Sequence, residues 1–179
     1  IKQVELNTIA ASFACLSTRV ASLHGQLVNR YAAELTGFMS TNKAAVLGNG
    51  GGNTVMALSD CDSVPEDPAL IRLADAMKVT YDRYQSRFRQ GVSDRPPLVI
   101  LFVVQEGESN TVDQRLLEFQ VWEDFQIPVL RRSLTQLSKI ATVDESTGSL
   151  LIENGAYEVA LVYFRAGYAP SDYPDGVDG

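Results

Sequence analysis

The sequence contains few of the residues on which several common kinds of catalytic site depend. His24 is the only histidine in 179 residues, which excludes a zinc site built from several histidines. It lies beside the apolar stripe of a predicted helix, where we expect a structural or surface role rather than a place in a histidine-based triad. The two cysteines, Cys15 and Cys61, are far apart and have no ligand-like neighbours. We therefore expect reduced structural thiols, as in a cytoplasmic protein.

Basic stretches and long apolar runs are also absent. The formal net charge is −7, from 15 basic and 22 acidic residues, so binding to nucleic acid or to an anionic membrane surface has no electrostatic support. The longest apolar run, residues 97–104, is much shorter than the roughly 18 residues of a membrane span. We expect neither nucleic acid nor membrane as a partner.

The two ends of the sequence resemble the interior of a protein. The chain starts with Ile-Lys-Gln-Val-Glu, without an initiator Met and without the charged-then-apolar layout of a signal peptide, and it stops abruptly at Gly179. The expectation is that the chain is a piece of a longer, cytoplasmic protein.

Apolar residues recur with helical or strand spacing along most of the chain. A stripe that starts at Phe13 predicts a long helix ending near Gly37. Asp67-Pro68 opens a second helix, with Asp as the cap and Pro at the first helical position. The run 98–104 is rich in branched residues, which is typical of a central parallel strand buried on both faces. The other expected elements are a strand at 2–6, a helix at 111–123, a strand at 127–130, a helix at 133–140, and a hairpin of 149–152 with 157–164 around a two-residue turn at 154–155.

This alternation of strands and helices predicts an α/β fold. The expected architecture is a doubly wound, mostly parallel sheet with helices on both faces. The apolar face of the second helix should carry Ile71, Ala74, Met77, Tyr81, Tyr84 and Phe88.

Three polar stretches directly follow strand-like runs, at residues 5–12, 105–115 and 165–168. In an open α/β sheet, ligands bind beyond the carboxyl ends of the strands. The stretches carry carboxylate and amide oxygens that suit an ammonium group, and arginines that suit a carboxylate. Arg165 is a better candidate than any lysine for binding a carboxylate, because its planar guanidinium can form two parallel hydrogen bonds with the two carboxylate oxygens. The residues themselves thus predict a site for a small polar ligand, such as a zwitterionic peptide.

The same three stretches resemble segments of eukaryotic-type glutathione synthetases, in the same order. The motifs are Glu-x-Asn-Thr-Ile-x-x-Ser-Phe from Glu5, Asn-x-x-Asp-Gln-Arg from Asn110 and Val-Tyr-Phe-Arg-x-Gly-Tyr from Val162, and Arg131-Arg132 also fits. The resemblance implies an ATP-dependent ligase of the ATP-grasp type, which forms homodimers. Such an enzyme joins γ-glutamylcysteine to glycine through an acyl phosphate.

The resemblance also implies roles for individual residues. Glu5 and Asn7 match the family's Mg²⁺ ligands, with Glu5 also near ATP, and hard oxygen ligands suit Mg²⁺. Arg165 and Tyr168 would hold the part of the dipeptide beyond the glutamyl end, while Ala166 and Gly167 give backbone contacts. Ala166 stands where Asp is common in the family. The residues that would line the dipeptide near its polar groups are Ile9, Ala10, Ala11 and Ser12, and those that would hold its glutamyl end are Glu108, Ser109, Asn110 and Gln114.

The resemblance divides the chain into three parts. Residues 1–12 would belong to the active-site core of the intact enzyme, 13–168 would form the substrate-binding α/β domain, and 169–179 an irregular tail. The family's ATP-binding lysines, glycine-rich lid and remaining metal carboxylate have no match here. We therefore expect the chain to need the missing ATP-grasp part and to be inactive alone.

Other interpretations remain open from the sequence. The glycine loop 48–53 lacks the Gly-Lys-Ser/Thr end of a phosphate-binding loop and the third glycine of a dinucleotide fingerprint. The role of residues 48–68, and the choice between glycine and β-alanine as acceptor, are not fixed by these residues. The main alternative is a stand-alone α/β module that binds a small peptide or amino acid without catalysis. A nucleotide-dependent oxidoreductase rests on fold analogy alone.

Overall fold

The computed structural model describes residues 12–41, 64–91 and 94–174, with the side chains of 39–41 left out. The chain divides into two compact units, one formed by residues 1–15 and 70–179 and the other by Leu16–Ala69. The expected strand at 2–6 and the glycine loop lie outside the described residues. None of the helices in the described ranges is long and apolar enough to cross a membrane.

The helical unit consists mainly of α1 (Ala14–Arg30) and α2 (Ala32–Thr41). A single helix ending near Gly37 was expected, whereas the helical path is irregular at Tyr31 and continues to Thr41. Helical hydrogen bonds from Tyr31 N to Leu27 O (3.0 Å) and from Leu35 N to Tyr31 O (2.9 Å) carry the path across this irregularity. The stripe side chains Val20, Leu23, Leu27 and Tyr31 are each more than 40% exposed.

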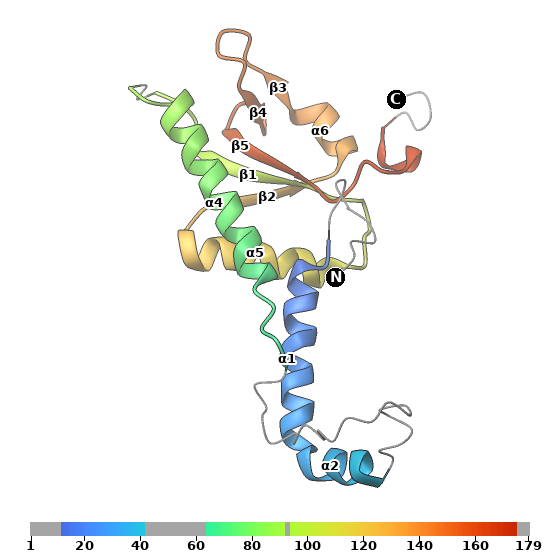
Figure 1. Ribbon diagram of the computed structural model, residues 1–179. Coiled ribbons are helices and arrows are strands. Elements are labelled where there is room, and N and C mark those ends of the chain that lie inside the picture. Colours follow the sequence, from blue (N-terminus) through green and yellow to red (C-terminus); the bar gives the residue numbers. More distant parts are fainter. Residues whose placement is uncertain (1–11, 42–63, 92–93, 175–179) are drawn as a thin grey trace, which may run out of the picture. The chain divides into compact units, whose positions relative to one another are not determined.

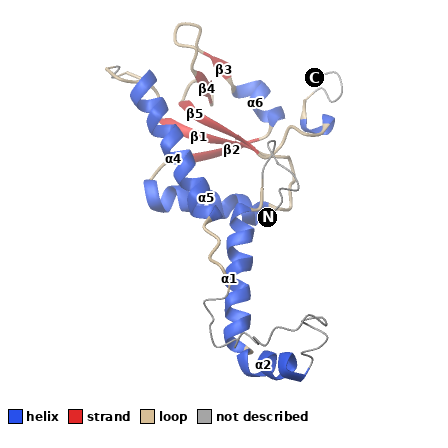
Figure 2. Cartoon of the chain, viewed as in Figure 1, coloured by secondary structure: helices blue, strands red, loops and turns tan. Residues whose placement is uncertain are grey.

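The larger unit is built on a five-stranded sheet in the order β2-β1-β5-β4-β3 (Figures 1 and 2). The central strand β1 (Leu98–Val103) pairs in parallel with β2 (Val129–Arg132) and with β5 (Tyr157–Phe164). β4 (Leu150–Ile152) and β3 (Thr142–Val143) continue the sheet antiparallel beyond β5. All six residues of β1 are buried, as the continuous apolar run predicts for a strand covered on both faces.

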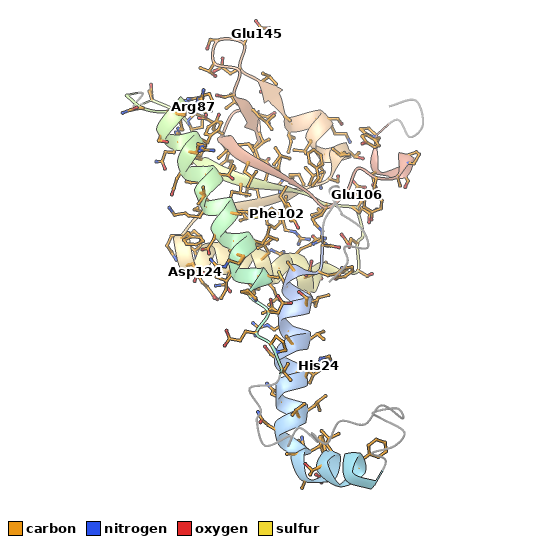
Figure 3. The ribbon with its side chains drawn as sticks, in the orientation of Figure 1. His24, Arg87, Phe102, Glu106, Asp124 and Glu145 are labelled. Atoms are coloured by element: carbon orange, nitrogen blue, oxygen red, sulfur yellow. The ribbon has the colours of Figure 1, made fainter. Side chains whose placement is uncertain are left out.

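Helices cover both faces of this sheet, so the prediction of a doubly wound α/β fold is confirmed. α4 (Ala69–Phe88) and α5 (Thr111–Phe125) pack on the face that carries Ile100 and Phe102, where the start of α1 contributes Cys15 (Figure 3). α6 (Leu134–Ile140) packs on the opposite face, against Val99, Leu101 and Val103. Alternate residues of β1 thus supply two separate cores.

Local details differ from the sequence-based expectation. Four residues, 153–156, separate the hairpin partners Ile152 and Tyr157, where a two-residue turn was predicted. Glu153 and Asn154 both have positive φ, 54° and 55°, and Gly155 follows at 91°, so the first three of the four loop residues are left-handed. On α4, Ile71 (52%) and Phe88 (56%) are exposed, because the buried face is shifted and begins at Leu70.

A fully buried carboxylate connects α4 to the sheet at the amino ends of the parallel strands. Glu158, the second residue of β5, has no exposed surface. Its Oε1 accepts a hydrogen bond from the Tyr84 hydroxyl (2.7 Å) and lies 2.7 Å from an Arg95 nitrogen. Arg89 Nε lies 3.5 Å from the other oxygen. This cluster is at the opposite end of the parallel strands from the polar stretches that the sequence singles out.

Candidate functional site

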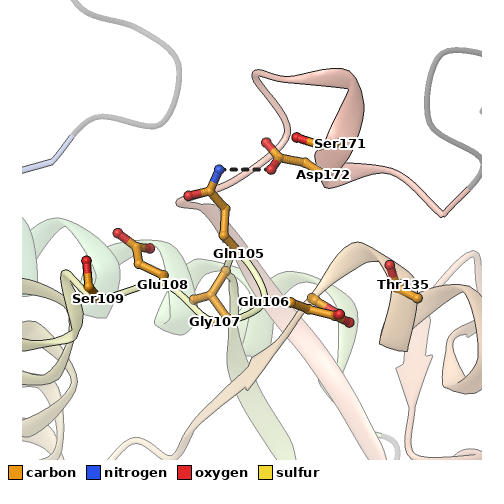
Figure 4. Close-up of a pocket in the computed structure, with 10 residues that line it drawn as sticks. Gln105, Glu106, Gly107, Glu108, Ser109, Thr135, Ser171 and Asp172 are labelled. Atoms are coloured by element: carbon orange, nitrogen blue, oxygen red, sulfur yellow. Dashed lines mark hydrogen bonds between the residues drawn. The ribbon is translucent and has the colours of Figure 1, made fainter.

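The connections from β1 and β2 leave the sheet toward opposite faces. β1 leads to α5 on one face, and the neighbouring strand β2 leads to α6 on the other. In doubly wound sheets this change of side opens a crevice at the carboxyl ends of the strands, where ligands bind. A hollow of about 450 Å³ lies at this point, lined by the loop after β1 and by Ser133, Thr135, Ser171 and Asp172 (Figure 4). A second hollow of about 480 Å³ adjoins the same loop and β2.

The loop after β1 is fixed from the α6 side. Ser133 caps α6 by accepting a hydrogen bond from Gln136 N at 3.1 Å, while the Gln136 side chain accepts one from Ser133 N at 3.0 Å. The Ser133 hydroxyl also donates to Glu106 Oε1 at 2.7 Å. Glu106 and Glu108 point in opposite directions from the loop (Figure 4). Two carboxylates are therefore presented at the crevice, one of them already engaged by the helix cap.

One carboxylate oxygen connects two of the polar stretches with Phe13, the last residue of the motif that starts at Glu5. Asp113 Oδ2, in the first turn of α5, accepts a hydrogen bond from Phe13 N at 3.1 Å and from Arg165 Nη1 at 2.6 Å. Asp113 and Arg165 are only 2% and 5% exposed. Burial by itself would lower the pKa of Arg165, but the hydrogen bond with Asp113 raises it above its usual value. Arg165 is therefore firmly charged and held in place inside the protein.

Phe13 adopts an unusual backbone conformation at this junction. Its φ is 68°, in the left-handed region that bulky side chains rarely occupy. The hydrogen bond from its amide to Asp113 helps to hold this conformation, because the carboxylate is itself fixed by Arg165. Strained backbone of this kind tends to occur where surrounding structure must place neighbouring residues accurately. The neighbour here is Ser12, which is exposed.

A second chain of hydrogen bonds runs through Gln114. The Gln114 side chain is fully buried; its Nε2 donates to Glu108 Oε2 and its Oε1 accepts from Arg131 Nη2. These contacts connect the loop after β1, the first turn of α5 and the end of β2. They bring together Glu108 and Gln114, two of the residues proposed for the glutamyl end, and add Arg131.

The loop after β5 is organised by Asp172. Its Oδ2 accepts hydrogen bonds from the backbone amides of Gly167 (2.9 Å), Tyr168 (3.2 Å) and Ala169 (3.2 Å). Its Oδ1 accepts one from Gln105 Nε2 at 2.9 Å (Figure 4). Gly167 has a φ of 102°, which a residue with a side chain would adopt only under strain. Residues 170–172, expected in an irregular tail, form a short 3-10 helix that places this carboxylate.

The acid sensitivity of this loop follows from the pKa of Asp172. Burial raises that pKa, but the hydrogen bonds from Gln105 and the three amides outweigh burial and hold it below its usual value of 3.8. A depressed folded-state pKa stabilises the folded protein above the unfolded-state pKa, and this contribution is lost as the pH falls through the folded-state value.

We therefore expect Asp172→Asn to destabilise the chain by about 1 kcal/mol at pH 7, the usual scale of a lost hydrogen bond. The difference from the wild type should shrink as the pH falls below 3.8. Urea unfolding at a series of pH values measures both effects. A difference that stays constant from pH 7 down to pH 3 would contradict the role given to the Asp172 charge.

The structure places the predicted site residues unevenly. Arg165 and Ala166 are buried, whereas Ser12, Ser109 and Tyr168 are exposed, Tyr168 by 60%. Asn110 and Gly167 are partly buried. The Ala166 side chain lies in the core with Val103 and Ile152. Those outside the described residues are Glu5, Asn7, Ile9, Ala10 and Ala11.

The expected metal site falls on residues that the structure does not describe. Glu5 and Asn7 are the proposed ligands. Within the described ranges, no group of three or more His, Cys, Asp or Glu side chains is arranged to hold a metal ion.

Sequence reasoning missed three residues that organise the site. Asp113 stands inside a motif that was quoted, but its role as the common acceptor required the fold to bring Phe13 and Arg165 to it. Asp172 lies in a segment rich in Pro, Asp and Gly, which carries no periodic signal. Arg131 follows a predicted strand and belongs to the Arg131-Arg132 pair that fits the resemblance, and these two signals could have added it to the list.

Comparison with known proteins supports the resemblance seen in the sequence. Residues 98–178 match the family model of eukaryotic glutathione synthase. The chain is 32% identical over 173 residues to a glutathione synthetase of Dictyostelium discoideum, with 97% of this chain and 30% of that protein covered. It is 32% identical over 179 residues to the glutathione synthetase large chain of Schizosaccharomyces pombe, with 97% and 32% covered. A chloroplastic glutathione synthetase of Solanum lycopersicum is 32% identical over 171 residues, with 96% and 25% covered.

The chain therefore spans about 25–32% of the length of these relatives. Among solved structures, the glutathione synthetase-like effector of Globodera pallida matches with a TM-score of 0.64 and 18% identity. The match covers 93% of this chain and 32% of that one. At this identity the match shows the fold. The predicted resemblance to eukaryotic-type glutathione synthetases is thus confirmed over part of their length.

Proposed function

We propose that this chain is the dipeptide-binding part of a glutathione synthetase, an ATP-dependent ligase that joins γ-glutamylcysteine to glycine through an acyl phosphate. The observation that carries the proposal is the meeting of the three motif-bearing stretches at Asp113. They meet beside a crevice of the right size and polarity for a small zwitterionic peptide. Similarity to glutathione synthetases over nearly the whole chain supports the same conclusion.

In this proposal the crevice holds the two ends of the dipeptide separately. Glu108, Ser109 and Asn110 take the glutamyl end, where carboxylate and amide oxygens can accept hydrogen bonds from its ammonium group. Gln114, which is fully buried, contributes by holding Glu108 in place. The loop from Arg165 to Tyr168 takes the rest of the dipeptide, with the backbone of Ala166 and Gly167 available for contacts. Ser12 and the residues before it, Ile9 to Ala11, complete the lining.

The nucleotide and the metal belong to the wider enzyme. Glu5 and Asn7 are the proposed Mg²⁺ ligands, Glu5 would also lie near ATP, and the ATP-grasp part would come from elsewhere in a longer polypeptide. A homodimer and a cytoplasmic location complete the proposal. Two of the relatives are named chloroplastic enzymes, so a plastid is the alternative location.

The test has a binding arm and an activity arm. Isothermal titration should detect γ-glutamylcysteine binding to the 179-residue chain, and this chain should release no ADP from ATP. A longer polypeptide that carries the chain should release ADP only when γ-glutamylcysteine, glycine and Mg²⁺ are all present. Replacing glycine with β-alanine identifies the acceptor.

The outcomes distinguish a dipeptide-binding part of a ligase from a binding module that has no catalytic role. ADP release by the chain alone would contradict the proposed division between dipeptide binding and nucleotide binding. Dipeptide binding without any dipeptide-dependent ADP release by the longer polypeptide would favour a binding module that has no catalytic role. Absence of dipeptide binding would contradict the proposal itself.

A further inference from the structure

Three arginines lie close together near the crevice, and two of them have internal counter-ions. Arg165 pairs with Asp113 at 2.6 Å, both of them buried. Arg115 donates to both carboxylate oxygens of Glu118 at 2.8 Å each. Among residues 12–41, 64–91 and 94–174, Arg131 forms no ion pair with any carboxylate. Glu118 and Glu108 favour its charge only from a longer distance, so Arg131 is the one guanidinium of this cluster that has no direct ion pair within the described ranges.

The surroundings of Arg131 leave it short of hydrogen-bond acceptors. It is the third residue of β2 and lies beside Phe102 of β1 in the parallel register. Nη2 donates to Gln114 Oε1, but the buried Nε has no hydrogen-bond partner among the described atoms. Burial lowers the pKa of Arg131, and the nearby positive charge of Arg115 lowers it further. A buried charged donor without an acceptor is costly, and an anion that binds beside it supplies the acceptor.

The position of Glu108 indicates which anion fits. Gln114 accepts from Arg131 at one end of its amide and donates to Glu108 at the other. A guanidinium and a carboxylate are therefore held one amide group apart, and both line the hollow beside β2. This arrangement of charges is complementary to the head group of an amino acid, which carries a carboxylate and an ammonium on one carbon.

We propose that Arg131 binds the α-carboxylate of the glutamyl residue while Glu108 accepts hydrogen bonds from its ammonium group. Gln114 holds the two side chains in register. This inference rests on the proposed function, because it names the group that recognises one end of the dipeptide. Arg131 is then a specificity-determining residue, which selects peptides whose glutamyl residue carries a free α-carboxylate.

The test compares two ligands that differ only in that carboxylate. They are γ-glutamylcysteine and 4-aminobutanoyl-cysteine, which keeps the ammonium group and lacks the α-carboxylate. The wild-type chain should bind γ-glutamylcysteine at least about tenfold more tightly, the scale of one charge-assisted contact. Arg131→Met should remove this preference by weakening γ-glutamylcysteine alone, with a change below about twofold for 4-aminobutanoyl-cysteine. Arg115→Met removes the same charge from the same hollow and should keep the preference.

Titration calorimetry of the three proteins, with circular dichroism to confirm folding, distinguishes the outcomes. Equal weakening of both ligands by Arg131→Met, or loss of the preference in Arg115→Met instead, would overturn the inference. If the wild type binds neither ligand, the proposed function fails and the inference fails with it. Should Arg131→Met not fold, Arg131→Lys keeps the charge but not the fork, so the preference should fall without being lost. An unchanged preference in that variant would overturn the inference.

Discussion

Replacing Asp113 with Ala should lower the free energy of unfolding of the chain by about 3–5 kcal/mol, the usual cost of removing one member of a buried ion pair. Asp113 and Arg165 are both almost fully buried, so the variant leaves the Arg165 guanidinium desolvated without its counter-ion. The same change removes the acceptor of the Phe13 amide, whose left-handed conformation then loses a stabilising contact. The loss should therefore be large for a single residue in the first turn of a helix.

Chemical unfolding followed by circular dichroism measures this effect, and Glu118→Ala is the matched control. Glu118 also pairs with an arginine from α5, but that arginine is 48% exposed at its side chain, so the control should cost less than about 1 kcal/mol. The double variant Asp113→Ala with Arg165→Met should recover part of the loss, because no unpaired charge is left behind. Equal effects of Asp113→Ala and Glu118→Ala would show that the buried pair contributes no special stability.

Glu158→Ala should also cost about 3–5 kcal/mol, at the other end of the sheet. Glu158 is fully buried and is approached by Arg95 and Arg89, so its removal leaves two poorly exposed arginines without their shared carboxylate. The Tyr84 hydroxyl loses its 2.7 Å acceptor as well. Because this cluster lies at the amino ends of the strands, the variant should bind γ-glutamylcysteine as the wild type does wherever it remains folded.

The comparison needs a control on the same helix. Asp82→Ala removes an exposed ion pair with Lys78 on α4 and should cost about 0.5 kcal/mol or less. Dipeptide titrations at a temperature where each variant is folded separate stability from binding. A loss of dipeptide affinity in folded Glu158→Ala that folded Asp82→Ala does not share would contradict a ligand site at the carboxyl ends of the strands.

The architecture of the sheet could be predicted because its signals are local. The run from Leu98 to Val103 is apolar at every position, and a strand of that kind needs cover on both faces. The capping pattern at Asp67-Pro68 marked the start of α4, where Asp67 Oδ1 accepts from Ala69 N at 2.9 Å. The four-residue loop 153–156 was missed because Asn154-Gly155 favours a two-residue turn, and the left-handed conformation of Glu153 has no sequence signature.

The sequence predicted which polar stretches form the site, but not which of their side chains contact one another. Parallel strands bring their carboxyl ends to one edge, so the loops after β1 and β5 had to meet there. Which side chain pairs with which depends on register and packing across more than 50 residues, as between Asp113 and Arg165. The sequence predicted Arg165 as a ligand for a carboxylate of the dipeptide, and its 5% exposure shows that most of its surface is in contact with the protein itself. Its direct contact with a dipeptide stays a prediction.

The central claim is that γ-glutamylcysteine binds where the strands β1 and β5 end. Amide chemical shifts of the ¹⁵N-labelled chain, recorded during titration with γ-glutamylcysteine, test it most directly. We expect saturable shifts for the amides of residues 108–114 and 165–169, with those around Tyr84, Ser149 and Glu158 unchanged. Saturable shifts confined to the Glu158 cluster, or no shifts at millimolar dipeptide, would contradict it.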